Sequence, residues 1–290
     1  MLKGAIDLHL HTTCSDGLDT PEELVGTAVS KGYSVISITD HDTVDGVIRG
    51  MEAARGTPLE LIPGIELSSL YDEKDVHIIG YYIDCDDKAF IKQIQFFKEK
   101  RHERAEEIVR CLNYLGLDLN IETVLKVAHG APIGRPHIAE ALLSENLTTT
   151  YNEAFALYIG MHCPAYVSKY KVTPEEAIDL ILNNGGIPVI AHPGSLNRDK
   201  LIEELIECGL MGIEVIHPAH TMEKQRYYQK LADKYGLIAT GGSDWHGKAR
   251  TQNRRYIDSY FHVPEKTISQ LKLLVNSRKD HSGKRTAEKT

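Results

Sequence analysis

Short apolar runs alternate with longer amphipathic segments along most of the chain. The runs are GAIDLHL, YSVISIT, LELIPGIEL, VHIIGYYI, GIPVIAH, MGIEVIH and GLIATGG. Each has the length of a buried strand, and helical periodicity fills much of the chain between them. This alternation is typical of repeated βα units, so it predicts an α/β fold built on a parallel sheet or barrel.

Two of the predicted helices carry the same start signal. In DTPEEL and VTPEEAI a threonine precedes a proline, and a glutamate follows three residues after the threonine. The threonine caps the helix, the proline takes the first helical position, and the glutamate closes a capping box. We therefore expect helices to begin at Pro21 and Pro174.

The pattern changes between residues 87 and 166, where helical periodicity continues without a strand-like run. We interpret 87–166 as an inserted helical subdomain, and 1–86 with 167–265 as the barrel domain that carries the chemistry. The last residues, 277–290, read SRKDHSGKRTAEKT. A segment so rich in charge and so poor in apolar residues is expected to be disordered.

Composition narrows the class of protein. The chain has 290 residues, 42% of them hydrophobic, and a formal net charge of −8. No basic surface is therefore expected for duplex DNA or a membrane. The 5 cysteines are scattered without a Cys-x-x-Cys pair, which indicates a reduced, cytoplasmic protein. Neither a signal peptide nor a membrane-spanning run is found.

Histidines and carboxylates close or follow nearly every apolar run, in a chain that holds 14 histidines. Alternation along a strand puts His9 and His11 on one face. Parallel strands gather their carboxyl ends at one rim of a barrel, where active sites form. The residues at these positions are His9, His11, Asp16, Asp40, His41, Glu66, His77, His192, Asp244 and His246.

Any one of these residues has an ordinary structural explanation. Asp40 or Asp244 could cap a helix, and His192 could be a turn residue before Pro193. Their recurrence at the same end of successive strands favours a metal centre instead. Imidazole and carboxylate ligands without thiolates suit Zn, Mn or Fe, and there are more of them than one ion takes. We expect two to three divalent ions.

The motifs DLHLHTTCSDG, SITDHDTVDG, GIELSS, DVHIIGY, AHPG and GSDWHG resemble those of the PHP (polymerase and histidinol phosphatase) superfamily, in the same order, from about Ile6 to His246. The resemblance implies a distorted barrel of seven βα units with a two- or three-metal centre. Some relatives carry histidine where this chain has Asp16. The implied ligands are His9, His11, Glu66 and Asp244 for a first ion, Glu66, His77 and His192 for a second, and Asp16, His41 and His246 for a third. Asp40 is expected to orient a metal ligand without binding the metal itself.

Within the superfamily the chain is most similar to the group of nucleoside 3′,5′-bisphosphate phosphatases and 5′-to-3′ exoribonucleases. IGRPHIA, YVSKY and GIEVIHPAH carry this likeness. It implies that Arg135 and Lys169 bind substrate phosphate, which a guanidinium fork and an ammonium suit. Alternatively, Arg135 forms an ion pair within the subdomain and Lys169 is a solvated charge. Candidate acid–base or substrate-contact residues are His217, His220 and His137, which could equally be packing residues.

These features predict a phosphoric ester hydrolase that acts on small nucleotides through a metal-bridging hydroxide. The 5′ ends of short single-stranded RNA are a further candidate substrate. A second hypothesis is a phosphatase for a sugar phosphate, a cyclic phosphate or histidinol phosphate. A third is a non-catalytic metal-binding module, against which the complete ligand set counts. A metal-dependent amidohydrolase would leave Arg135 and Lys169 without a role.

Overall fold

The computed structural model describes residues 4–196, 198–247 and 263–287. Seven strands form one sheet, in which they neighbour one another in chain order. Each predicted apolar run contains or overlaps one strand, and the predicted α/β fold is confirmed. The strands are β1 (Ala5–Leu10), β2 (Tyr33–Ile38), β3 (Glu60–Tyr71), β4 (Lys74–Tyr81), β5 (Ile187–Ile190), β6 (Gly212–Ile216) and β7 (Ile238–Gly241).

Strand β4 runs against its neighbours, whereas the other neighbouring strands pair in parallel. The expectation of a wholly parallel sheet is therefore wrong at β4. Only Asp72 and Glu73 connect β3 to β4, and both have positive φ, 49° and 61°. Such a turn closes a tight hairpin, because a parallel connection needs a crossover of a dozen or more residues. As a result, the amino-terminal half of β4 lies at the rim where the parallel strands end.

Backbone contacts join the two outer strands of the sheet. The His11 amide donates to the Trp245 carbonyl and the Asp244 amide to the His9 carbonyl, both at 2.9 Å. A Cβ at Gly242 would lie 2.3 Å from the Cβ of His9, so only glycine permits this approach. The residues after β7 thus reach β1, so the sheet curls and its two outer strands come together.

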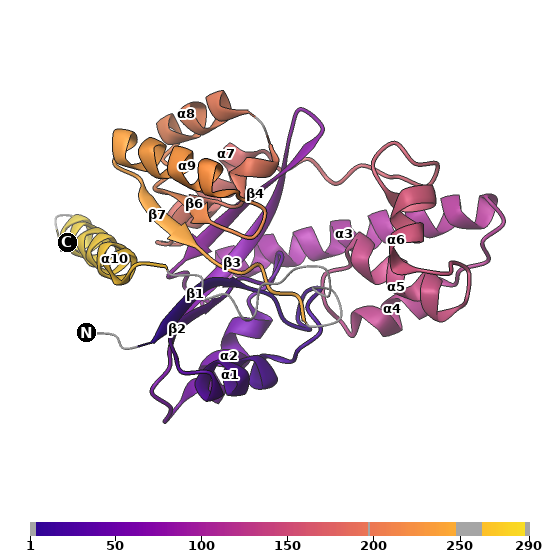
Figure 1. The fold of residues 1–290 in the computed structure, drawn as a ribbon, viewed down its shortest axis with the longest axis horizontal. Helices are drawn as coiled ribbons and strands as arrows, with labels where there is room; N and C mark the ends of the chain where they lie inside the picture. The colour runs from indigo at the N-terminus through magenta and orange to yellow at the C-terminus, as the bar shows by residue number, and fades with distance from the viewer. Residues whose placement is uncertain (1–3, 197, 248–262, 288–290) are drawn as a thin grey trace.

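Helices pack on the outside of the strands, as Figure 1 shows. Both predicted capping boxes are present, on α1 and α7. Two clusters of buried apolar side chains join the helices to the strands, one under α1 and α2 and one under α7, α8 and α9. These helices are α1 (Pro21–Ser30), α2 (Asp45–Ala54), α7 (Pro174–Asn183), α8 (Asp199–Glu207) and α9 (Met222–Tyr235); a short 3-10 helix, η2 (Pro193–Ser195), precedes α8.

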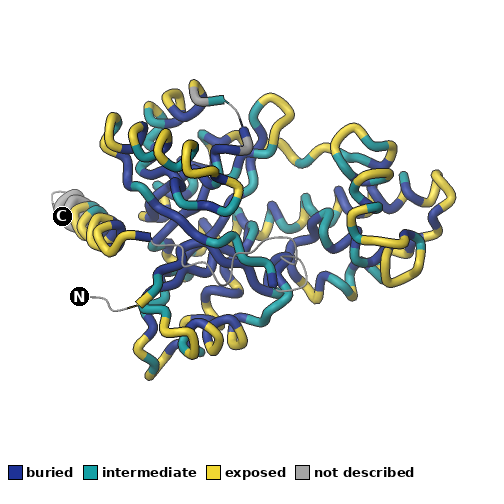
Figure 2. Tube along the Cα trace, in the orientation of Figure 1, coloured by how far each residue is buried: buried dark blue, intermediate teal, exposed yellow. Residues whose placement is uncertain are grey.

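Residues 82–186, all of which the structure describes, contain helices and no strand. Part of this region extends away from the sheet and has its own buried apolar cluster (Figures 1 and 2). The domain boundaries themselves stay a prediction, and residues 248–262 of the predicted barrel domain lie outside the described residues. The helices before α7 are α3 (Lys88–Tyr114), α4 (Ile121–Ala128), α5 (Arg135–Ser144), α6 (Tyr151–Ala154) and the π-helix η1 (Phe155–Ile159).

The carboxyl-terminal segment begins as a helix, and the expected disorder of 277–290 stays a prediction. Helix α10 (Glu265–Ala287) continues through most of 277–290, and residues 288–290 lie outside the described part of the chain. Ile268, Leu271 and Val275 bury one side of its first turns. Once these contacts have formed a helix, each further residue extends it at small cost, so a polar sequence can follow.

Candidate metal centre

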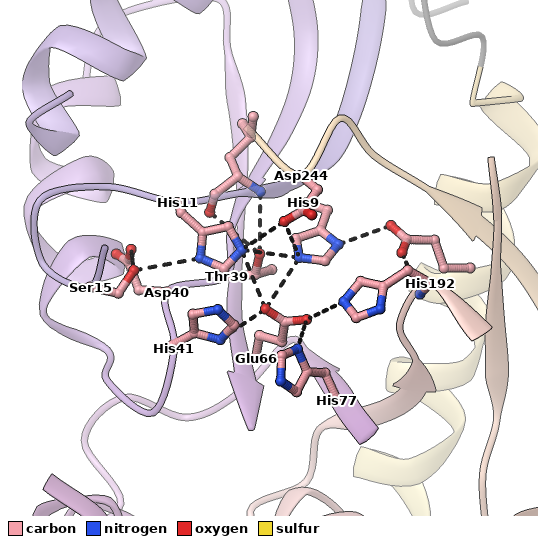
Figure 3. A network of polar contacts seen from close by, with 12 residues as sticks. His9, His11, Ser15, Thr39, Asp40, His41, Glu66, His77, His192 and Asp244 are labelled. Carbon is pink, nitrogen blue, oxygen red and sulfur yellow. Dashed lines mark hydrogen bonds and ion pairs between the residues drawn. The ribbon is translucent and has the colours of Figure 1, made fainter. Parts of the chain in front are cut away.

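His9 on β1 and His11 directly after it face the inside of the curved sheet, where both are 0% exposed. Their Nε2 atoms lie 3.1 Å apart. Glu66 Oε2 is 3.4 Å from His9 Nε2 and 3.3 Å from His11 Nε2, and Asp244 Oδ1 is at the same two distances. Four potential ligand atoms from β1, β3 and the loop after β7 therefore converge on one point (Figure 3).

The other oxygen of Glu66 faces a second pair of histidines. Glu66 Oε1 lies 3.1 Å from His77 Nδ1 and 3.1 Å from His192 Nε2. His77 belongs to the antiparallel strand β4, and His192 follows β5. The carboxylate of Glu66 thus lies between two groups of imidazoles, with one oxygen toward each (Figure 3).

A third group lies beside the first. Asp16 Oδ1 is 3.3 Å from His246 Nε2 and 4.0 Å from His41 Nε2. Ligand atoms of His11, Asp16, His41 and His246 all lie within 4.8 Å of one another. Every residue in the predicted ligand set is therefore within this one region of the barrel.

Metal binding fits the polar atoms of this region. His41 Nδ1 and Glu66 Oε2 are buried and 3.0 Å apart, yet neither makes a hydrogen bond among the described residues. His77 Nε2 is also buried without one. Buried polar atoms are normally satisfied, so atoms left unsatisfied in one place indicate a bound group. The donor set of imidazoles and carboxylates suits Zn, Mn or Fe.

The charges of the site favour a cation. Burial opposes the protonation of His9, but the carboxylates of Glu214, Glu66 and Asp244 outweigh it and raise the His9 pKa well above its usual value. Despite burial, the neighbouring carboxylates of Asp244 and Glu66 raise the pKa of His11 to about 10. Carboxylates that stabilise a proton on these rings will stabilise a metal ion beside them.

Two of the converging residues have backbone angles that L-residues rarely adopt. His192 has φ 30° and Asp244 has φ 52°. Such conformations cost free energy and persist where the surrounding structure holds them, often at functional sites. The turns after β5 and β7 are thus shaped to direct these two side chains inward.

Asp40 supports the loop that follows β1. It accepts hydrogen bonds from the Thr12 amide and hydroxyl, both at 2.7 Å, and from the Ser15 hydroxyl at 2.6 Å. Ser15 Oγ in turn lies 3.5 Å from His11 Nδ1. Asp40 therefore reaches His11 through Ser15 of this loop, and its role in orienting a metal ligand stays a prediction.

The sequence interpretation missed Glu214. This carboxylate is buried in β6, with Oε1 3.0 Å from His9 Nδ1 and Oε2 accepting the His192 amide at 2.8 Å. A hydrogen bond to Nδ1 leaves His9 Nε2 free to face the cluster. The available signal was a lone carboxylate within the apolar run MGIEVIH.

Arg135 and Lys169 lie together at one side of the site. Arg135 Nη2 is 3.3 Å from Asp75 Oδ2, and Lys169 Nζ is 3.0 Å from Asp75 Oδ1. Asp75 precedes His77 by two residues on β4, so both cations lie beside the cluster. These ion pairs lower the pKa of Asp75 despite its partial burial.

The three remaining candidate histidines differ in their surroundings. Both ring nitrogens of His137 face backbone groups, the Gly134 amide and the Ser15 carbonyl. Those of His220 likewise face the Gly194 amide and the Val215 carbonyl. These contacts favour structural roles for both rings.

His217 instead faces the cluster. Its Nε2 lies 3.4 Å from Asp244 Oδ2, and its Nδ1 accepts the Ala219 amide at 3.1 Å. The proton of the neutral ring is therefore on Nε2, toward Asp244. Of the three candidates, His217 is the one with a ring nitrogen directed at the cluster, and its role as an acid–base or substrate-contact residue stays a prediction.

A family model described as PHP domain matches residues 7–184. The chain belongs to the PHP domain family. Its structure is also similar to that of a metal-dependent phosphoesterase from Bifidobacterium adolescentis, with a TM-score of 0.84 and 28% sequence identity. That match covers 94% of this chain and 96% of the other. The predicted family and a metal-dependent phosphoester hydrolase activity are thus confirmed.

Curated relatives extend the comparison. Phosphoribosyl 1,2-cyclic phosphate 1,2-diphosphodiesterase of Eggerthella lenta is 32% identical, over 83% of this chain and 94% of the relative. A 3′,5′-nucleoside bisphosphate phosphatase of Chromobacterium violaceum is 32% identical, over 83% and 87%. The 5′-3′ exoribonuclease Rnm of Escherichia coli is 32% identical, over 83% and 84%.

None of the described helices has the length and apolarity needed to cross a membrane.

The central position of Glu66 leads to the first prediction. Glu66→Gln keeps the shape of the side chain but removes its charge, so activity should fall about 100-fold or more and bound metal should decrease. Glu60→Gln is a matched control on the same strand, because Glu60 pairs with Lys272 at 2.7 Å, away from the cluster. Phosphate release and elemental analysis measure both effects. Wild-type activity and metal content in Glu66→Gln would refute this central role.

Proposed function

We propose that this chain releases phosphate from small nucleotides, with nucleoside 3′,5′-bisphosphates and 5′-monophosphates as the first substrates to test. The observation that carries the proposal is the pair of cations, Arg135 and Lys169, beside His77 at the metal centre. Such cations suit phosphate oxygens. The nucleoside bisphosphate phosphatase among the relatives supports the same substrate class.

The proposed cofactors are two to three divalent ions, Mn, Fe or Zn, divided among three groups of ligands. When bound, such ions supply positive charge that stabilises a phosphoryl transition state and activates water. Glu66 would be shared between the first two groups, because its two oxygens face different histidines. The proposed groups are His9, His11, Glu66 and Asp244; Glu66, His77 and His192; and Asp16, His41 and His246.

The protein's own residues would bind and orient the substrate. Arg135 offers two parallel N–H groups to phosphate oxygens, and Lys169 offers a single strong charge. His217 would keep its proton on Nε2, where it can donate a hydrogen bond to Asp244 or to a substrate oxygen beside it. Asp40 and Glu214 would fix the loop and the ring that carry the ligands.

Two related substrates need to be distinguished from small nucleotides. The cyclic phosphate diphosphodiesterase of Eggerthella lenta is as similar in sequence as the nucleotide phosphatase, which supports a cyclic phosphate as a second candidate. The exoribonuclease supports short RNA with a 5′ phosphate. Hydrolysis of either substrate would break a phosphoester bond, as hydrolysis of a nucleotide does.

A phosphate-release screen of the manganese-loaded protein tests the proposal. The substrates are nucleotides, cyclic nucleotides, sugar phosphates, a phosphoribosyl cyclic phosphate and short oligonucleotides, with total nucleotide products measured by chromatography. We expect the highest kcat/KM for a nucleotide, and loss of turnover on chelation until metal is restored. A clear preference for a sugar phosphate or a cyclic phosphate would overturn the nucleotide assignment.

Arg135 provides a second test of the substrate class. Arg135→Ala should lower kcat/KM more for a nucleoside 3′,5′-bisphosphate than for p-nitrophenyl phosphate, because the generic ester has no second phosphate to bind. Arg135→Lys should recover part of the loss, since a point charge does not replace a bidentate fork. Arg110→Ala is the control, because Arg110 is exposed on α3 and pairs with Glu107. Equal losses on the two substrates would contradict the assignment.

A further inference from the structure

Arg101 on α3 is a largely buried cation to which the proposed function gives no role. Its side chain is 13% exposed. Nε donates to Asp42 Oδ2 at 2.7 Å, Nη2 donates to Ser68 Oγ at 2.8 Å, and Nη1 donates to the Ile133 carbonyl at 3.4 Å. Every nitrogen of the guanidinium group therefore has a partner in the protein, which indicates a connection between parts of the chain rather than an open site for an anion.

Helix α3 fixes Arg101 between two apolar clusters. Phe90 and Phe97 in its first half belong to the cluster under α7, α8 and α9, whereas Ala105 and Ile108 belong to the cluster of the helical region. One continuous helix thus spans both parts of the structure, as Figure 1 shows. The backbone of Arg101 is anchored on both sides, so its guanidinium group offers a firm contact to the loops beside it.

The loop that Arg101 contacts is paired with β3 at two candidate ligands. The Glu66 amide donates to the Asp40 carbonyl at 3.2 Å, and the Asp42 amide donates to the Glu66 carbonyl at 3.1 Å. These two hydrogen bonds form a parallel bridge between His41 and Glu66, just beyond the end of β2. Asp42 therefore follows the ligand His41 directly and completes the backbone pairing that places it beside Glu66.

Asp42 depends on its contacts for its conformation and its charge. It is 4% exposed and has a φ of 53°, which an L-residue keeps where the surrounding structure holds it. Its Oδ1 accepts the Ser68 amide at 2.9 Å, and Arg101 faces its Oδ2. Without the guanidinium group this buried carboxylate would lose its counter-charge, which costs free energy. Displacement of the loop toward water would relieve that cost.

The second contact of Arg101 lies next to another candidate ligand. Ser68 is opposite His77 in the register of β3 and β4. Ligand atoms of His41, Glu66 and His77 lie within 4.8 Å of one another (Figure 3). Each of these three residues has a buried polar atom without a hydrogen bond among the described residues. Arg101 thus contacts neighbours of the side chains whose polar atoms indicate a bound ion.

We propose that Arg101 is a positioning residue of the metal centre: by holding Asp42, it keeps His41 beside Glu66 in the geometry that binds an ion. Arg101 touches neither the metal nor the substrate. The inference rests on the proposed metal centre, in which His41 belongs to the third group of ligands. Glu66 lies in a strand that β4 also pairs, whereas His41 lies in a loop. Loss of Arg101 should therefore displace His41 first and weaken the ion that it binds.

Manganese titration of the substrate-free protein tests the proposal, with free Mn²⁺ measured by electron paramagnetic resonance. We expect Arg101→Gln to weaken one class of bound ion about 10-fold or more, as is typical when a group that holds a ligand is removed, and to leave the other ions nearly unchanged. Arg110→Gln, an exposed change on the same helix, should bind Mn²⁺ as wild type does. Wild-type affinity for every ion in Arg101→Gln would overturn the proposal.

A second substitution tests the route through Asp42. Asp42→Asn removes the carboxylate that Arg101 neutralises. The double variant Arg101→Gln/Asp42→Asn leaves no uncompensated charge and should recover part of the Mn²⁺ affinity that Arg101→Gln loses. An additive loss in the double variant would refute this route.

Kinetics separate positioning from substrate binding. With p-nitrophenyl phosphate, Arg101→Gln should lower kcat at limiting Mn²⁺, and excess Mn²⁺ should restore it because the ion still binds at higher concentration. KM at saturating Mn²⁺ should stay close to that of wild type. A KM that stays raised at saturating Mn²⁺, together with unchanged metal affinity, would assign Arg101 to the substrate and refute the proposal.

The remaining outcomes are distinguished by the same titration. If Arg101→Gln does not fold, as judged by its melting curve, Arg101→Lys replaces it, because lysine keeps the charge but not the fork. Wild-type Mn²⁺ affinity in that variant would refute the proposal. A wild-type protein that binds a single ion would refute the metal centre and this proposal with it. Absence of phosphate release from every substrate would refute the proposed function alone, since Mn²⁺ binding is measured without substrate.

Discussion

The buried carboxylate of Glu66 is the constraint on which the site depends. It is 0% exposed and contacts histidines from both of its oxygens. A carboxylate taken out of water costs several kcal/mol unless opposite charge compensates it. The compensating groups come from β1, β4 and the loops after β2 and β5, so the curved sheet must form before they can meet. Fold and metal centre therefore stabilise each other.

The curvature of the sheet follows from a few local features. The two-residue turn at Asp72 and Glu73 reverses β4 and brings His77 to the rim. Gly242 permits the close approach to β1, and the positive φ of Asp244 then directs its carboxylate inward. These local backbone conformations bring polar residues that are far apart in the sequence into one cluster.

The cations proposed to bind substrate phosphate, Arg135 and Lys169, come from the helical region. Their shared partner Asp75 lies on β4, two residues before His77. Arg101 of α3 donates hydrogen bonds to Asp42 and Ser68, which join this helix to the strand region. A positive field is thus placed next to the metal centre of a protein whose net charge is −8. On this account the helical region contributes substrate recognition and the barrel contributes the ions.

Local patterns were sufficient to predict the strands, the capping boxes at Pro21 and Pro174, and the residues that converge on Glu66. The direction of β4 was not predicted, because an apolar run carries no sign of its orientation and the hairpin turn lacks glycine or asparagine. Glu214 was missed because a single carboxylate in a buried strand has no repeating pattern. The pairing of Asp75 with Arg135 joins residues far apart in sequence, which no local signal indicates.

Anomalous X-ray scattering from crystals of the manganese-loaded protein, measured at the manganese absorption edge, tests the central claim most directly. The account predicts at least two peaks, with one oxygen of Glu66 at coordination distance from each of two ions and His9, His11, His77 and His192 around them. A third peak is expected between Asp16, His41 and His246. A single peak, or peaks that leave Glu66 without a metal contact, would contradict the account.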